Sequence, residues 1–171
     1  MLSEAALSRS TADPITDVKG GVANISIQDT DSANLATCRS QKGSGPSFTT
    51  ATGAGRLFGA RWADGQGNVY SGFNAVLPPN SPTCGSNQEY AGLVSASSYH
   101  TGGVNVVLAD ASGKFVSDSV SALTNPLPAG RTDPFATGAN GAPGQSYDGP
   151  SLFGIWGAYG SINRSESGGI L

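Results

Sequence analysis

Charged residues are scarce in this chain of 171 residues, which carries a formal net charge of −3. They make up 12% of the sequence, against roughly 25% in typical globular proteins. The nine lysines and arginines are scattered singly, so no basic stripe is present that would release counterions from nucleic acid. We therefore expect no nucleic-acid partner.

Long hydrophobic runs are also missing. No apolar stretch approaches the ~20 residues that a membrane-spanning helix requires, and Met1–Leu7 lacks the charged-then-apolar order of a secretion leader. Low charge and abundant Ser, Thr, Gly and Asn are nevertheless typical of an exported protein, so we expect an extracellular or periplasmic location. An exported composition without an export signal predicts that an N-terminal part is missing.

Histidine and cysteine are rare as well, because the chain holds His100, Cys38 and Cys84 and no others of either type. A bridge between the two cysteines would close a long loop and stabilise the fold by roughly 3–4 kcal/mol. Two buried free thiols are the alternative. Structural zinc requires four ligands at close paired spacings, which these residues do not provide.

Glycine and proline are plentiful, with 25 and 10 residues, which predicts many turns. The polar stretches 41–55 and 126–147 are expected to be flexible loops. The clearest pattern lies in Ser98–Ser119, where the apolar run Val104–Ala109, a turn at Asp110–Gly113 and a second alternating segment predict a β-hairpin. We expect a single domain over residues 1–171, of α+β class and β-rich, with a central antiparallel sheet containing the Val104–Ser119 hairpin.

Four further segments have weaker local signals. The Asp31–Cys38 segment would carry Leu35 and Cys38 on one helix face. The expectations are a short helix over Ser3–Arg9 capped by Ser3, a helical turn over Pro14–Val18, a helix over Asp31–Cys38 capped by Asp31 or Ser32, and a strand or extended segment over Gly149–Asn163.

His100 and Asp110 are an imidazole and a carboxylate, the usual pair for acid–base chemistry or metal binding. They flank one predicted strand, so they would lie roughly 30 Å apart if the chain between them were extended. The competing interpretation is that both residues anchor turns at the two ends of the strand. We favour turn anchors, because a lone histidine without a nucleophile or a second ligand rarely makes a site.

Two other groups of residues are weaker candidates for a site. Asp64, Gln66 and Asn68 form an oxygen-rich segment that is a weak Ca²⁺ candidate without the acidic spacing of an EF-hand. No other cofactor is expected. Three aromatic side chains could line a ligand groove: Trp62, Tyr70 and Trp156. The alternative is that they pack in the core, which is the commoner place for such rings.

The nine-residue spacing between His100 and Asp110 resembles the H-X9-DG segment of the prepilin-processing-associated proteins, the DUF1559 family of planctomycetes and related bacteria. Three other segments resemble segments of that family and follow its order: Gly55–Asp64, Asn74–Cys84 and Gly154–Ser161. In one departure, Ala111 stands where the family segment has glycine, so we expect Gly113 to supply a positive φ instead. The family's N-terminal pilin-like helix has no counterpart here.

The resemblance implies a pseudopilin-like globular head without its N-terminal helix, in which His100, Asp110 and Gly113 mark the hairpin. It implies other pilin-like subunits or cell-surface components as partners, and membrane attachment only through the missing helix. The leading hypothesis is therefore a non-enzymatic extracellular head domain for filament or secretion-apparatus assembly or for surface interaction. The alternatives are a solute- or glycan-binding module that uses exposed aromatic rings, and an enzyme that uses His100.

Overall fold

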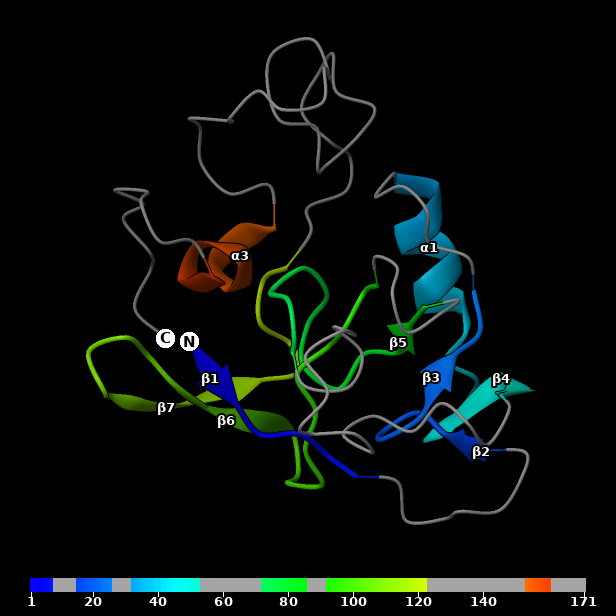
Figure 1. Ribbon diagram of the computed structural model, residues 1–171, viewed down its shortest axis with the longest axis horizontal. Coiled ribbons are helices and arrows are strands. Elements are labelled where there is room, and N and C mark those ends of the chain that lie inside the picture. The colour runs from blue at the N-terminus through cyan, green and yellow to red at the C-terminus, as the bar shows by residue number, and fades with distance from the viewer. Residues whose placement is uncertain (8–14, 26–31, 53–71, 86–91, 123–152, 161–171) are drawn as a thin grey trace, which may run out of the picture.

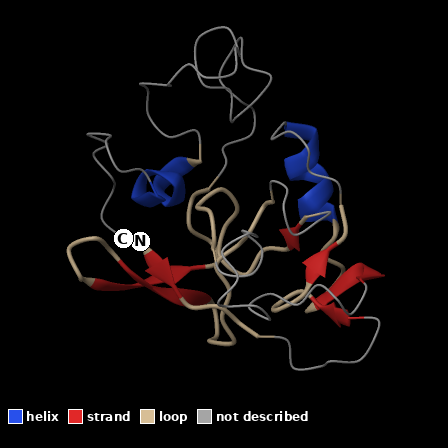
Figure 2. Cartoon of the chain, viewed as in Figure 1, coloured by secondary structure: helices blue, strands red, loops and turns tan. Residues whose placement is uncertain are grey.

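The computed structural model describes residues 1–7, 15–25, 32–52, 72–85, 92–122 and 153–160 of the chain. These residues form short strands and two helices, so the fold is α+β and β-rich (Figures 1 and 2). The elements follow one another as β1 (Leu2–Ser3), β2 (Ile15–Asp17), β3 (Val22–Ala23), α1 (Ser32–Ser40), β4 (Ser47–Thr52), β5 (Thr83–Cys84), β6 (Gly103–Val107), β7 (Gly113–Ser117) and α3 (Gly154–Gly160).

A three-stranded antiparallel sheet in the order β1-β6-β7 carries the predicted hairpin, which is confirmed. Along β6, Val104 and Val106 are buried whereas Asn105 and Val107 are exposed, which is the alternation of a sheet with one covered face. Helix α3 covers the buried face of the sheet (Figure 1). There Trp156 packs against the valines.

Two smaller sheets and α1 form the other side of the molecule (Figure 2). Strands β2 and β4 pair antiparallel, and β3 and β5 pair parallel. The predicted helix over Asp31–Cys38 is confirmed and ends at Ser40, while Asp31 lies outside the described residues. Leu35 and Cys38 are fully buried on one face of α1, as their spacing predicted.

The core has two main clusters, one beside α1 and one under the hairpin. The segment from Leu93 to Ala96 joins them, because Leu93 belongs to the first cluster and Ala96 to the second. Its polar groups are satisfied within the protein: Ser95 donates its hydroxyl to the Pro82 carbonyl. The buried members are Val18, Ala23, Leu35, Cys38, Phe48, Val76, Leu77, Cys84 and Leu93 in the first cluster, and Ala96, Val104, Val106, Val116 and Trp156 in the second.

The N-terminal helix predictions are wrong. Leu2 and Ser3 pair with β6 in place of a helix, and the Glu4 N–H donates to the Asn105 carbonyl at 3.2 Å. Ile15–Asp17 likewise forms β2 on β4. Helices this short are marginal unless tertiary packing stabilises them, so pairing with a neighbouring strand prevails over the capping signal.

The loop predicted over residues 41–55 is also incorrect in part, because residues 47–52 form β4. Phe48 on this strand is buried in the first cluster, which anchors an otherwise polar segment. The second predicted loop, 126–147, lies outside the described residues.

The predicted strand over Gly149–Asn163 is contradicted by α3, which spans Gly154–Gly160. Glycine disfavours helix, but here it permits close packing: a Cβ at Gly160 would lie 2.8 Å from the Ala75 side chain. The helix start is tied to the hairpin side by the Trp156 N–H, which donates to the Ser121 carbonyl at 2.9 Å. Burial of Trp156 therefore outweighs the weak helix propensity of the segment.

Candidate functional site

The polar residues at the base of the hairpin gather around Glu4. The His100 Nε2 lies 3.1 Å from Glu4 Oε1. Asn105 donates its side-chain amide to the same oxygen at 2.7 Å and its backbone N–H to Glu4 Oε2 at 3.1 Å. The carboxylate therefore joins the N-terminal segment to β6 and takes the place of a backbone acceptor beyond the end of β1.

The environment of Glu4 favours its charged form. Partial burial raises the pKa of Glu4, but the hydrogen bonds from Asn105 and Ser98 and the nearby His100 ring outweigh it and bring the pKa to about 2. Glu4 is therefore ionised at neutral pH. It is a surface contact that orders the N-terminus.

The hairpin turn is a three-residue loop, Ala109–Ala111, held by two backbone hydrogen bonds that both involve Leu108. The Leu108 N–H donates to the Ser112 carbonyl and the Ala111 N–H donates to the Leu108 carbonyl, both at 3.0 Å. Asp110 Oδ1 accepts the Ser112 hydroxyl at 2.7 Å and its N–H at 2.9 Å. These two bonds, the hydroxyl first, hold the pKa of Asp110 below its usual value.

Ala111 takes the left-handed conformation of this turn, with φ of 65°. The expectation that Gly113 would supply the positive φ is therefore incorrect, because Gly113 begins β7 with ordinary strand geometry. Three-residue hairpin loops usually end on a left-handed residue, most readily glycine. Position 111, where the family segment has glycine, is thus the position of this turn that requires a positive φ.

Asn80 is the polar centre between the hairpin and the rest of the core. It is 5% exposed and has φ of 59°, a conformation that Asn tolerates better than most residues. Its Nδ2 donates to Asp118 Oδ1 at 2.6 Å, and its Oδ1 accepts the Ser98 N–H at 2.8 Å. The residue therefore fixes the turn after Pro78-Pro79 against both ends of the hairpin.

Tyr99 ties three separate segments together next to His100. Its hydroxyl lies 2.7 Å from Asp17 Oδ2, 2.9 Å from the Leu7 carbonyl and 3.0 Å from the Lys19 carbonyl. The Lys19 ammonium lies 6.0 Å from the centre of the Tyr99 ring, within cation–π range, and donates to the Ser98 carbonyl. The start of the hairpin segment is thus bound to the N-terminal part of the fold.

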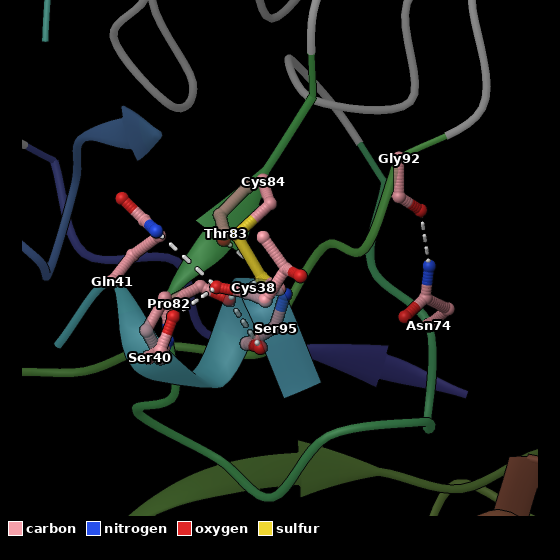
Figure 3. The surroundings of a disulfide bond; sticks show 10 residues. Cys38, Ser40, Gln41, Asn74, Pro82, Thr83, Cys84, Gly92 and Ser95 are labelled. Atoms are coloured by element: carbon pink, nitrogen blue, oxygen red, sulfur yellow. Dashed lines mark hydrogen bonds between the residues drawn. A yellow bond between two sulfur atoms is a disulfide. The ribbon is translucent and has the colours of Figure 1, made fainter. Parts of the chain in front are cut away.

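Cys38 and Cys84 form a disulfide, as predicted (Figure 3). Their Cα atoms are 5.9 Å apart and both residues are fully buried. The bond joins α1 to β5, where Thr83 also accepts the Ser95 N–H through its hydroxyl. The bridge is a structural one, enclosed by the first core cluster.

The structure separates the candidate ligand-binding residues. Trp156 is 0% exposed and stacks on Phe73 with ring centres 6.1 Å apart, so its indole belongs to the core and does not reach a ligand at the surface. Among the described residues, no three His, Cys, Asp or Glu side chains gather to hold a metal ion. The remaining candidates, Trp62, Tyr70, Asp64, Gln66 and Asn68, lie outside the described residues.

His100 and Asp110 are each held by a different partner. His100 contacts Glu4, whereas Asp110 is engaged with Ser112 in the turn. The five-residue strand β6 lies between them in the sequence. These contacts can hold the hairpin turn in place and order the N-terminal segment.

A family model described as a protein of unknown function, DUF1559, matches residues 1–123. The chain belongs to the DUF1559 family. Comparison with curated proteins and with solved structures gave no match. In this DUF1559 protein, no helix of the described part is long and apolar enough to cross a membrane.

Sequence reasoning missed Glu4, Tyr99 and Asn80, three residues that organise this region. Asn80 carried a usable signal, since asparagine after two prolines favours a turn with a left-handed residue. Glu4 carried none, because its partner Asn105 is 101 positions away. Tyr99 is equally dependent on contacts that are distant in sequence.

Proposed function

We propose that this DUF1559 protein is the non-enzymatic, extracellular head domain of a pseudopilin-like protein, which serves assembly or surface interaction. The observation that carries the proposal is the buried Cys38–Cys84 disulfide. Disulfides form and persist in oxidising compartments such as the periplasm and the cell exterior. The low content of charged residues supports the same location.

The pseudopilin-like part of the proposal rests on sequence resemblance. Four segments follow the order of the prepilin-processing-associated proteins, from Gly55 to Ser161. That resemblance supports partners among pilin-like subunits or cell-surface components. It also supports attachment to the membrane through an apolar helix N-terminal to the head.

The non-enzymatic part is supported by the roles that the hairpin's polar groups already fill. His100 and Asn105 hold Glu4, and Asp110 holds the turn through Ser112. Each contact stabilises backbone geometry. Side chains that hold the backbone in this way favour a structural role at a binding surface over a catalytic role.

Fractionation of the full gene product tests the proposal. The native protein, expressed from its complete gene, is expected in the envelope fraction, with Cys38 and Cys84 unreactive toward alkylating reagents until a reductant and denaturant are added. A cytoplasmic protein with two reactive thiols would contradict it. An exported protein that lacks an apolar helix and binds a glycan would favour the binding module instead.

A further inference from the structure

Strand β7 leaves one edge of the hairpin sheet open. The order β1-β6-β7 places β7 last, and Figure 1 shows it at the margin of the molecule. The Asp118 N–H donates to the Gly102 carbonyl at 2.9 Å, which sets the alternation of the ladder. Lys114 and Val116 therefore direct their backbone groups toward β6, while Gly113, Phe115 and Ser117 direct theirs outward.

The outward groups are accessible and mostly unused within the described residues. Phe115 is 52% exposed, and Lys114 and Ser117 are also exposed. The Ser117 carbonyl accepts the Val120 N–H, whereas the outward N–H and C=O of Phe115 bond to no other residue of the described part of the chain. Unpaired strand edges of this kind are templates for a further strand.

The face of the sheet opposite α3 carries an exposed apolar side chain on each of its three strands. Leu2 is 72% exposed and lies beside Val107, which is 42% exposed. The Phe115 ring lies over Gly103, where a Cβ would collide with it. A strand added to β7 would extend this apolar face.

We propose that a second copy of this chain pairs antiparallel along β7, with the two-fold axis at Val116. In this register Phe115 lies opposite Ser117 of the second copy, so their outward backbone groups meet. Lys114 lies opposite Asp118 of the second copy, and the reciprocal pair forms on the other side of the axis. Opposite charges directly across a strand pair are favourable, with Cβ atoms about 5 Å apart.

The charge of Lys114 favours the register centred on Val116 over the register centred on Phe115. An axis at Phe115 would also join outward backbone groups, but it would bring Lys114 diagonal to Lys114 of the second copy. The register centred on Val116 replaces that repulsion by two attractive pairs. One oxygen of Asp118 accepts the Asn80 amide, which holds the carboxylate in place, and the other is left for Lys114.

The contact is expected to be weak, because a single strand edge buries less than the ~1,000 Å² usual for stable complexes. A two-fold interface suits self-association, since one patch supplies both halves. This surface deepens the proposed assembly role and rests on it. The test uses the head alone, so its failure would remove this surface, whereas failure of fractionation would remove the assembly role.

Sedimentation velocity of the 171-residue chain over a concentration series tests the pairing. We expect a monomer–dimer equilibrium that weakens with added salt, because the charge pairs are exposed. Lys114→Glu places two carboxylates opposite each other and should weaken dimerisation about tenfold. Lys42→Glu makes the same charge change at an exposed residue that bridges to Phe48 on β4, outside the hairpin sheet, and should leave the equilibrium unchanged.

Ser117→Pro supplies a second, independent variant. It removes an outward N–H but no bond to β6, since proline is tolerated on an edge strand at such a position. Far-UV circular dichroism should match the wild type while dimerisation is lost. A wild-type protein that remains monomeric throughout, or dimerisation that is unchanged in both Lys114→Glu and Ser117→Pro, would overturn the proposal.

Discussion

At Ala111 the methyl side chain disfavours the backbone conformation that the turn requires. A left-handed conformation costs a non-glycine residue about 1–2 kcal/mol, and Ala111 adopts it with φ of 65°. The Asp110–Ser112 hydrogen bonds hold the turn in spite of this cost. The strain arises from one methyl group, so its removal should be beneficial.

Ala111→Gly is expected to raise the free energy of unfolding by about 0.5–1 kcal/mol, because the gain in the turn exceeds the added entropy of the unfolded chain. Urea denaturation measures the change. Ala109→Gly is the matched control: Ala109 is exposed in the same loop without a positive φ, so its replacement should be neutral or destabilising. Stabilisation by both variants alike would contradict the argument.

Glu4 makes the free energy of unfolding depend on pH in the acidic range. Its pKa is lowered to about 2 from the usual value of 4.5, so ionised Glu4 stabilises the fold above pH 4.5 and this contribution is lost as the pH falls toward 2. Other carboxyl groups titrate in the same range, so the difference between two proteins is the useful quantity. Glu4→Gln keeps an acceptor for Asn105 but cannot ionise.

The stability difference between wild type and Glu4→Gln should therefore be largest near neutral pH and shrink between pH 4.5 and 2. Chemical denaturation at a series of pH values measures it. A difference that is constant across this range would show that the Glu4 charge does not couple to folding.

At the scale of elements, the Cys38–Cys84 disulfide joins α1 to β5 covalently. The disulfide spans 46 positions of sequence, and loop entropy predicts that such a bridge stabilises the fold by about 4 kcal/mol. Because both cysteines are fully buried, alanine at each would fit without new polar groups.

The double variant Cys38→Ala and Cys84→Ala is accordingly expected to lose about 4 kcal/mol of unfolding free energy, measured by urea denaturation. Wild-type protein unfolded with a reductant provides the control and should show a similar loss. If the double variant were as stable as the oxidised wild type, the bridge would contribute nothing to the fold.

Elements were predictable where local pattern and tertiary contact agree. The hairpin was found because valine alternation and turn residues point to the same structure, and α1 because Leu35 and Cys38 share one face. Strand β1 and helix α3 were missed because their conformation is set by distant partners, β6 for one and the Trp156 pocket for the other. The candidate site behaved likewise: the disulfide could be predicted from composition, whereas Glu4 could not.

At the scale of the whole molecule, two core clusters share one connecting segment. Leu93 packs beside the disulfide and Ala96 beneath the hairpin, so neither cluster can lose its packing without disturbing the other. We therefore expect the described part of the fold to unfold cooperatively.

Leu35→Ala in the first cluster should lower stability by about 3 kcal/mol, and Val106→Ala in the second by about 2 kcal/mol. In a Trp62→Phe background, Trp156 fluorescence reports on the second cluster and far-UV circular dichroism on the whole. Both signals should shift together in either variant. A Leu35→Ala protein whose dichroism changes before its fluorescence would show that the two clusters unfold separately.

Among the described residues, β7 is the longer of the two edge strands of the hairpin sheet. Beyond Ser3 the Glu4 carboxylate occupies the backbone N–H of Asn105, so the β1 edge offers no continuous ladder to another strand. If the pairing proposed along β7 forms, it joins two molecules and leaves no second β7 edge open. A longer array of this protein would then require a different surface, with the pair as its repeating unit.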